Sequence, residues 1–242
     1  MSSYEKRFYR TRTASAEWAS FTVAVKESDL WIRARRDLSS AGYEALYNVR
    51  YPVETYIQQH PEFQEALVPL PPDPLAPALI REMLAAGRQA GVGPMAAVAG
   101  AIAEGVGRAL QPWSPEIIVE NGGDLFLASR EPLTVGLYAG KSPLSHRIGV
   151  ALPPRPEGAG LCTSSGTVGH SLSFGQADAV TVLSVSAALS DAAATAVGNL
   201  VRTGKDIPAA LDRAQEIAGI EGVLIVIGDQ LGIWGQLAIV PL

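Results

Sequence analysis

The chain has 242 residues, of which 48% are hydrophobic and 18% are charged, and its formal net charge is −5. This composition indicates a compact globular protein, and the negative charge argues against nucleic acid or an anionic membrane as the main partner. The sequence has no run of about 20 apolar residues and begins with a polar segment, so we expect a soluble cytoplasmic protein without a membrane span. Its single cysteine, Cys162, excludes an internal disulfide.

The first part of the chain predicts a hairpin followed by a helix. Alternating apolar residues on both sides of a Glu-Ser-Asp turn predict a β-hairpin over residues 20–34. Residues 39–60 are typical of a helix with a break near Pro52, because proline cannot continue a helix cleanly, and Pro61 ends it. The proline-rich residues 69–77 are expected to form an extended connector.

Two helices rich in small residues are predicted next, over residues 79–90 and 96–110. In the second helix Gly100, Gly105 and Gly107 each cost about 1 kcal/mol of helix propensity relative to alanine. Tight packing of this helix onto a sheet is the simpler explanation for these glycines. Approach of the helix backbone to a ligand is the alternative.

A strand, a tight turn and a second strand are predicted over residues 116–127, because Asn-Gly is the strongest short signal for a hairpin turn. The turn consists of Asn121, Gly122, Gly123 and Asp124. A plain turn explains the asparagine and the glycines without any chemistry. It explains Glu120 and Asp124 less well, because these two carboxylates flank the turn and place negative charges near each other.

The middle of the chain is predicted to contain a strand over residues 133–138 and a flexible loop over residues 153–160. A polar loop at residues 163–167 follows, since glycine permits unusual φ angles and short hydroxyl side chains bond nearby backbone. A β-branched strand over residues 179–185 comes next.

An alanine-rich helix is predicted over residues 187–201, with Gly204 as a stop signal. A further helix at residues 207–218 and strands within residues 222–242 complete the chain.

The order helix, strand, Gly-Asp turn, strand occurs at residues 96–138 and again at residues 187–241. This order indicates either an internal duplication with pseudo-twofold symmetry or a chance likeness. A duplication would place the two alanine-rich helices side by side on a sheet. The predicted fold class is α+β, with a mainly antiparallel sheet and helices packed on one face. We expect a single domain over residues 1–242, in which residues 20–60 are a candidate subdomain.

Asp191 and Thr195 are four positions apart on the predicted helix, so they share one face one turn apart. A carboxylate and a hydroxyl in this arrangement can both face one hard cation such as Mg²⁺. The alternative is structural, because the helix dipole favours Asp near a helix start and Thr can bond back to the preceding turn. Cys162 has no Cys/His/Asn framework around it, which favours a structural thiol over a nucleophile.

Four segments resemble motifs of the ApbE-type FAD:protein FMN transferases. The turn Asn121-Gly-Gly-Asp124 resembles the N-x-G-G-D signature of that family, and Gly100-Ala-Ile-Ala-Glu-Gly105 resembles its G-x-I-A-K-G helix. Ser190-Asp-Ala-Ala-Ala-Thr195 resembles its A-D-A-x-A-T segment, and Thr163-Ser-Ser-Gly166 followed by His170 resembles its T-S-G…H loop. The motifs keep the order of the family over residues 91–199. The wider pattern is closer still to an uncharacterised protein family related to ApbE.

The resemblance implies an ApbE-like fold with a pocket for FAD or a related nucleotide and Mg²⁺. It implies that Asp191 and Thr195 are metal ligands, with a backbone carbonyl near Gly100 or Ala101 as another, and that His170 lies at the chemistry as a catalytic residue. The implied nucleotide-binding residues are Asn121, Gly122, Gly123, Asp124, Thr163, Ser164 and Gly166. In the family, Mg²⁺ holds the pyrophosphate while a threonine of a target protein attacks the FMN phosphate and AMP leaves.

The sequence also departs from the ApbE pattern. Glu104 stands where the family has a lysine, and a carboxylate beside a diphosphate repels it unless a metal intervenes. The segment after His170 lacks the aspartate and proline of the family, and the aspartate that follows the lysine motif is replaced near Arg108 or Ala109.

Three hypotheses of function follow from these departures: a divergent flavin or nucleotidyl transferase, a non-catalytic ligand-binding or sensing module, and a structural protein on an inherited fold. The sequence leaves open whether the protein is an enzyme. The expected partner is a small-molecule nucleotide. The small-residue surfaces would permit a homodimer, and no protein target is indicated.

Overall fold

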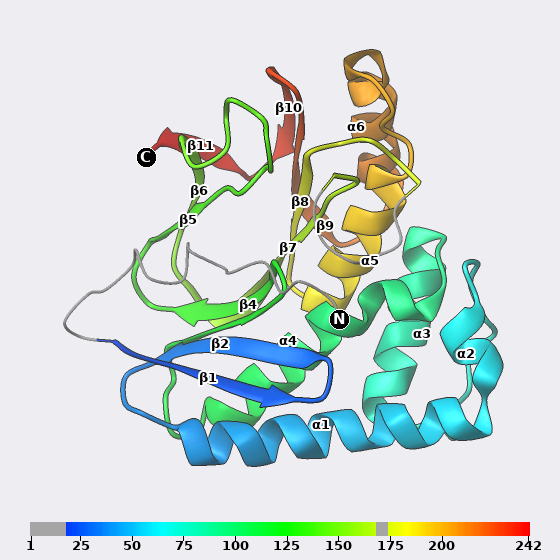
Figure 1. Ribbon diagram of the computed structural model, residues 1–242, viewed down its shortest axis with the longest axis vertical. Helices are drawn as coiled ribbons and strands as arrows, with labels where there is room; N and C mark the ends of the chain where they lie inside the picture. The colour runs from blue at the N-terminus through cyan, green and yellow to red at the C-terminus, as the bar shows by residue number, and fades with distance from the viewer. Residues whose placement is uncertain (1–17, 168–173) are drawn as a thin grey trace.

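The computed structural model describes residues 18–167 and 174–242, which form two antiparallel sheets and a set of helices (Figure 1). The large sheet has eight strands in the order β1 (Ala19–Val25), β2 (Ser28–Ala34), β3 (Ile117–Asn121), β4 (Asp124–Ser129), β7 (Arg155–Ser164), β8 (Ala179–Ser184), β9 (Ile220–Ile227) and β10 (Gln230–Gly235). The small sheet has three, in the order β11 (Ala238–Pro241), β6 (Ile148–Leu152) and β5 (Leu133–Gly136).

The helices of the described residues are α1 (Ser39–Gln59), α2 (Pro61–Glu65), α3 (Ala78–Ala90), α4 (Val98–Leu110), α5 (Ala187–Gly198) and α6 (Ile207–Glu216). Two short 3₁₀ turns, η2 (Pro94–Ala97) and η3 (Gly204–Asp206), precede α4 and α6. The observed elements agree with the predicted α+β class, and the helices lie on one side of the large sheet (Figure 1).

Alternate residues of the large sheet pack against different layers. Val182 and Ile225 point towards α3, α5 and α6, while residues of β2, β3 and β4 pack beneath α1 and α4. Leu161, Leu183 and Leu224 face the other way and pack against the small sheet. Burial of an aliphatic side chain of this size contributes about 1.5–3 kcal/mol. The molecule therefore has three layers, with the large sheet in the middle.

The glycines of α4 allow close packing, as the simpler sequence interpretation proposed. A methyl group on Gly100 would overlap the carbonyl oxygen of Ala187 in α5 and lie 2.9 Å from Cβ of Asp191. A methyl group on Gly107 would overlap the ring of Phe126 in β4. The two alanine-rich helices, α4 and α5, therefore lie side by side on the large sheet (Figure 1).

Of two expectations about proline, the break near Pro52 was wrong, and the end of the helix before Pro61 was confirmed. Helix α1 continues through Pro52 without a break. Proline lacks the N–H that would bond to the carbonyl of Asn48, and because Asn48 is an exposed residue, water can take that place. Helix α1 ends at Gln59, before Pro61. Pro61 also begins α2, where its missing N–H costs nothing because the first N–H groups of a helix have no intrahelical partner.

The predicted loops in the second half were also partly wrong. Residues 155–160 belong to β7 rather than to a flexible loop, and Thr163 and Ser164 end the same strand. Gly204 begins η3 instead of stopping α5, which ends at Gly198. The expected duplication stays a prediction, because η3 and α6 separate α5 from β9 whereas α4 leads directly into β3.

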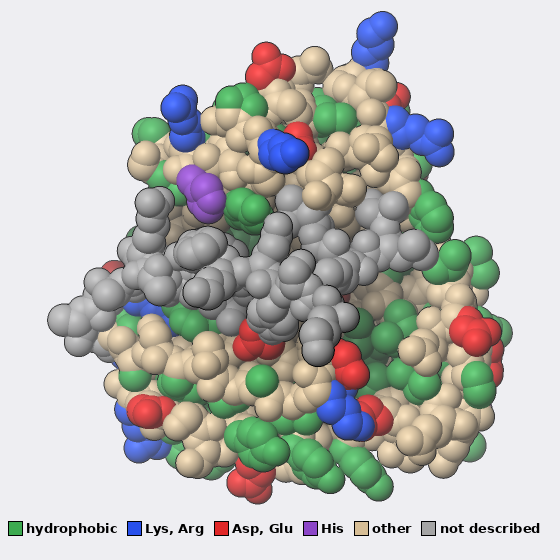
Figure 2. All heavy atoms as spheres, viewed as in Figure 1, with side chains coloured by type: hydrophobic (Ala, Val, Ile, Leu, Met, Phe, Trp, Pro, Cys, Tyr) green, Lys and Arg blue, Asp and Glu red, His purple; other side chains and the backbone are tan. Residues whose placement is uncertain are grey.

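The outer face of α1 carries three tyrosines spaced four residues apart. Tyr43, Tyr47 and Tyr51 are each more than half exposed, and the rings of Tyr47 and Tyr51 stack with centroids 6.2 Å apart. Hydrophobic side chains are visible along the lower edge of the molecule over α1 in Figure 2.

No individual helix among residues 18–167 and 174–242 combines the length and the apolar character needed to cross a bilayer. Within those same described ranges, one pair of helices, Ala78–Ala90 and Pro94–Leu110, bent by 105°, meets both criteria together.

Candidate functional site

The turn between β3 and β4 fixes two of the predicted site residues. Gly122 and Gly123 have φ angles of 72° and 117°, a left-handed pair that suits a two-residue hairpin turn. Asn121 and Asp124 face each other across this turn. The Asn121 side-chain amide donates to the carbonyl of Ala99 at 3.2 Å, and Asp124 Oδ1 accepts from the backbone N–H of Thr163 at 3.2 Å. The turn thus joins the start of α4 to the end of β7.

Asp191, the fifth residue of α5, reaches the same place from the opposite side. Its Oδ2 accepts a hydrogen bond from the backbone N–H of Gly100 at 2.9 Å, and the N–H of Ala99 also bonds to this carboxyl. Both N–H groups lie in the first turn of α4, where they have no intrahelical partner and carry the positive end of the helix dipole. The carboxyl of Asp191 therefore caps α4 from the neighbouring helix.

The two carboxyl groups, Asp124 and Asp191, influence each other. Burial raises the pKa of Asp191 to about 7, although the N–H groups of Gly100 and Ala99 oppose this rise. Burial also raises the pKa of Asp124 well above its ordinary value, and the nearby charge of Asp191 raises it further. Like charges that interact in this way disfavour ionisation of both carboxyls, and a positive charge beside them would favour it.

Thr195 follows Asp191 by one turn of α5 and is partly buried. Ser164 lies against the same helix further along, because its Oγ is 3.7 Å from where a methyl group on Gly198 would stand. Thr163, the residue before it, shares a 2.8 Å hydrogen bond between its Oγ1 and that of Thr181 in β8. The hydroxyl groups at the end of β7 thus lie beside α5 and β8.

Gly166 holds together the two ends of the loop that follows β7. Its N–H donates to the carbonyl of Ala177 at 2.9 Å, and a methyl group at this position would overlap the carbonyl oxygen of Gly175. A second contact joins the same two segments: Asp178 Oδ1 accepts a hydrogen bond from the hydroxyl of Thr167 at 3.0 Å. The proposed catalytic residue His170 lies outside the described residues.

Glu104, the charge reversal noted in the sequence, bonds to groups within the protein. Its Oε2 accepts from the backbone N–H of Ala187, the first residue of α5, at 2.7 Å. Its Oε1 accepts from the guanidinium of Arg108 at 3.0 Å. The negative charge of Glu104 is therefore balanced by a helix N-terminus and by an arginine within the protein.

The structure brings most of the predicted site together at the start of α4. Asn121, Asp124 and Thr163 are connected by the contacts above, as is Asp191 through Gly100. Among the described residues, no group of three or more His, Cys, Asp and Glu side chains could hold a metal ion. Any cation here would also need hydroxyl, backbone or ligand oxygens.

Three contributions were missed from the sequence: the carbonyl of Ala99, the hydroxyl of Thr181 and the capping carboxylate of Glu104. Of these three, Glu104 alone had a signal in the sequence, its i, i+4 spacing from Arg108. That spacing indicates an ion pair and not a helix cap. Cys162 is free and fully buried, and burial raises the pKa of its thiol well above its ordinary value.

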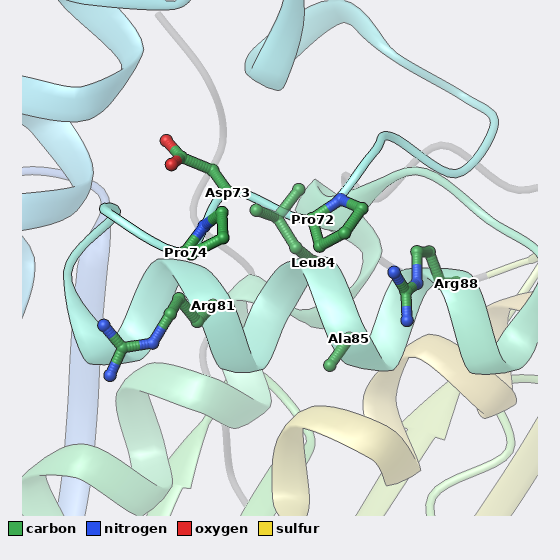
Figure 3. Close-up of a pocket in the computed structure, with 7 residues that line it drawn as sticks. All are labelled: Pro72, Asp73, Pro74, Arg81, Leu84, Ala85 and Arg88. Carbon is green, nitrogen blue, oxygen red and sulfur yellow. The ribbon is translucent and has the colours of Figure 1, made fainter.

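A shallow pocket of about 100 Å³ lies apart from these residues, between the proline-rich connector and α3. Pro72 and Pro74 form one wall, and Arg81 and Arg88 extend from α3 (Figure 3). Arg81 Nη1 donates to the carbonyl of Ala76 at 2.8 Å. None of the predicted site residues that the structure describes lines this pocket.

The sequence is similar to several UPF0280 proteins. A UPF0280 protein of Methanosphaerula palustris is 41% identical over 218 residues, which cover 90% of this chain and 87% of that protein. A UPF0280 protein of Methanocaldococcus jannaschii is 40% identical over 231 residues, covering 91% and 92%.

Two solved structures have a similar fold. The ApbE protein of Thermotoga maritima matches with a TM-score of 0.62 at 14% identity, covering 89% of this chain and 96% of that one. The apo flavinyl transferase ApbE of Pseudomonas stutzeri matches with a TM-score of 0.58 at 15% identity, covering 90% and 94%. At such low identity the likeness concerns the fold.

The sequence model of the family described as AbpE bacteria matches residues 10–233, which is most of the chain. The chain therefore belongs to the AbpE bacteria family and has the fold of the ApbE flavin transferases.

Proposed function

We propose that the protein binds FAD or a related nucleotide together with Mg²⁺ where α4, α5, the β3–β4 turn and the end of β7 meet. The observation that carries this proposal is the paired carboxyls of Asp124 and Asp191, held within one hydrogen-bonded group at the start of α4. Such a pair favours a cation, and a cation favours a phosphate-bearing ligand.

The donor chemistry fits Mg²⁺. Asp191 supplies a carboxylate and Thr195 a hydroxyl on the same face of α5, and both are hard oxygen donors of the type that Mg²⁺ prefers. Burial raises the pKa values of Asp124 and Asp191, and a divalent cation would oppose this rise by stabilising both carboxylates. When bound, Mg²⁺ would neutralise the charge of a diphosphate.

The surroundings fit a nucleotide. Gly122 and Gly123 present backbone without side chains at the β3–β4 turn, and Thr163 and Ser164 supply hydroxyl groups at the end of β7. Gly166 closes the adjoining loop. Of two solved proteins with the same fold, one is named a flavinyl transferase ApbE and the other an ApbE protein. These names support a flavin nucleotide as the first ligand to test.

A binding protein without turnover is the second candidate. Glu104 replaces the lysine of the ApbE motif, and its carboxylate is bonded to the start of α5. A cation that would stabilise developing negative charge is therefore missing from this position. If the protein is a transferase, His170 is the proposed catalytic residue, and AMP is the expected product from FAD.

FAD binding measured by fluorescence titration, with Mg²⁺ and with EDTA, tests the proposal. Wild type is expected to bind FAD only with Mg²⁺, and Asp191→Ala is expected to lose binding. Thr195→Val should weaken binding while Thr195→Ser, which keeps the hydroxyl, should not. The exposed Asp212 of α6 provides the control Asp212→Ala, expected to bind like wild type.

Absence of binding to wild type under both conditions would contradict the FAD and Mg²⁺ proposal. Where binding occurs, chromatography of the incubated nucleotide separates the two candidates. Release of AMP supports a transferase, and recovery of intact FAD supports a binding protein.

A further inference from the structure

Helices α4 and α5 cap each other through a reciprocal pair of hydrogen bonds. Asp191 of α5 accepts from the N–H of Gly100 in α4, and Glu104 of α4 accepts from the N–H of Ala187 in α5. In each helix, the residue that supplies the carboxylate follows the residue that donates its N–H by four positions. The two contacts are thus related by an exchange of the helices, with Gly100 matching Ala187 and Glu104 matching Asp191.

The backbone around Ala187 leaves little freedom for α5 to shift. A methyl group on Gly100 would overlap its carbonyl oxygen, and a methyl group on Gly160 of β7 would lie 2.6 Å from its nitrogen. The buried thiol of Cys162 donates to the same carbonyl at 3.3 Å. The first residue of α5 is therefore enclosed by α4 on one side and by β7 on the other.

Glu104 is itself held in place. Arg108 pairs with it at 3.0 Å, stacks on Phe126 with its guanidinium carbon 4.8 Å from the ring centroid, and donates to the carbonyl of Glu157 at 2.7 Å. These contacts connect the capping carboxylate to β4 and β7 of the large sheet.

From this arrangement we propose that Glu104 is a positioning residue for the candidate site, and the inference rests on the proposed function. Through its hydrogen bond to the N–H of Ala187, Glu104 fixes the position of α5 along α4 and the rotation of α5 about its own axis. That placement determines where Asp191 and Thr195 stand relative to the start of α4. In this chain Glu104 therefore has an architectural role at the position where the ApbE motif has a lysine.

The first test needs no ligand. Amide hydrogen exchange is measured by NMR on the isotope-labelled full chain in EDTA. Glu104→Ala should speed exchange at Ala187, and also at Gly100, by about tenfold, since hydrogen bonds to charged groups are among the stronger ones. Faster exchange at Ala187 with unchanged exchange at Gly100 would overturn the proposal, because Glu104 would then be only a local cap.

Two further variants separate length from charge and guard against a failure of Glu104→Ala to fold. Glu104→Gln keeps an oxygen at the right distance and should exchange within about twofold of wild type. Glu104→Asp keeps the charge but is one methylene shorter, so it should behave like Glu104→Ala. The reverse order, with Asp resembling wild type and Gln resembling Ala, would contradict a positioning role.

The second test measures the Mg²⁺ concentration that gives half-maximal FAD binding. Glu104→Ala and Glu104→Asp should raise it about tenfold, and Glu104→Gln by no more than about twofold. Asp206→Ala is the matched control, because Asp206 accepts from the N–H groups of Arg202 and Thr203 before a helix that carries no site residue. Its binding should be unchanged.

The two tests keep the two proposals distinguishable. If wild type binds no FAD, the proposed function fails, while the exchange experiment still decides whether Glu104 positions α5. If wild type binds FAD and all three Glu104 variants bind with the Mg²⁺ dependence of wild type, the positioning role is wrong and the proposed function stands.

Discussion

The carboxylate of Asp191 and the backbone N–H of Gly100 meet at 2.9 Å, joining the middle of one helix to the start of its neighbour. This contact gives Asp191 two potential partners, the N-terminus of α4 and the proposed cation. The charge of the same carboxyl acts on the buried Asp124, so it has consequences for both stability and binding.

Asp191→Asn is expected to change how stability depends on pH in EDTA. The pKa of Asp191 is about 7 in the folded protein, above its ordinary value of 3.8, so the fold holds a proton that the unfolded chain releases between these values. Its stabilising contribution is complete below pH 4 and is lost as the pH rises through 7, with a slope of at most about 1.4 kcal/mol per pH unit.

Urea unfolding at pH 5 and pH 8 measures this effect. Relative to wild type, Asp191→Asn should gain stability between the two pH values, because the variant carries no charge to bury. Added Mg²⁺ should stabilise wild type at pH 8 and leave the variant unchanged. A stability difference between the two proteins that does not vary with pH would contradict the raised pKa.

Gly100→Ala is expected to destabilise the protein by about 1–3 kcal/mol, because overpacking forces a shift of backbone. Its new methyl group would meet the carbonyl of Ala187 and lie 2.9 Å from Cβ of Asp191. Gly105→Ala is the control on the same helix, where the nearest atom is a side-chain methyl carbon of Val49 at 3.1 Å. Thermal unfolding should show a clear loss for the first variant and a change within about 1 kcal/mol for the second.

Gly123→Ala should weaken nucleotide binding more than Gly122→Asn does. Gly123 has a φ of 117°, which side chains rarely adopt, whereas asparagine tolerates the 72° of Gly122. Straining the turn would displace Asn121 and Asp124 together. FAD titration with Mg²⁺ provides the measurement, and equal affinities for the two variants would show that the turn conformation does not matter for binding.

The hydroxyl pair of Thr163 and Thr181 should show strong coupling. Thr181 is almost fully buried, so Thr163→Val leaves the Thr181 hydroxyl without its partner and is expected to cost about 1–3 kcal/mol. The double variant Thr163→Val/Thr181→Val removes both polar groups and should be less destabilised than the sum of the singles. Urea unfolding of the four proteins completes the cycle, and additive losses would exclude the coupling.

Much of the fold was visible in the sequence wherever local signals agreed. The Asn-Gly turn predicted the β3–β4 hairpin, and the alternation around the Glu-Ser-Asp turn predicted β1 and β2. The side-by-side packing of α4 and α5, expected only if the chain contains a duplication, is present in the structure.

Strand β7 was missed because its proline and its glycines resemble a loop. Gly158 has a φ of +92° and lies against the ring of Phe126, and the pairing with β4 shifts register between Leu127 and Ser129. A bulge of this kind accepts residues that disfavour regular strands. Local propensity therefore indicated a loop where the pairing of distant strands produced an irregular strand.

The candidate site was predictable only as a set of motifs. The resemblance to ApbE grouped Asn121, Asp124 and Asp191, but no sequence pattern indicated that Gly100 and Ala187 would offer their N–H groups to carboxylates. Such contacts depend on the relative placement of two helices. For the same reason, the charge of Glu104 seemed to oppose a phosphate ligand when considered without its backbone partner.

The 91 positions that separate Gly100 from Asp191 have a consequence for folding. The hairpins β1–β2, β3–β4 and β9–β10 pair neighbouring segments and can form early, because closing a short loop loses little chain entropy. The capping contacts between α4 and α5 require β7 and β8 to have joined the centre of the sheet. During refolding, ligand binding should therefore appear later than sheet structure, and a nascent chain would acquire it only once α5 had been synthesised.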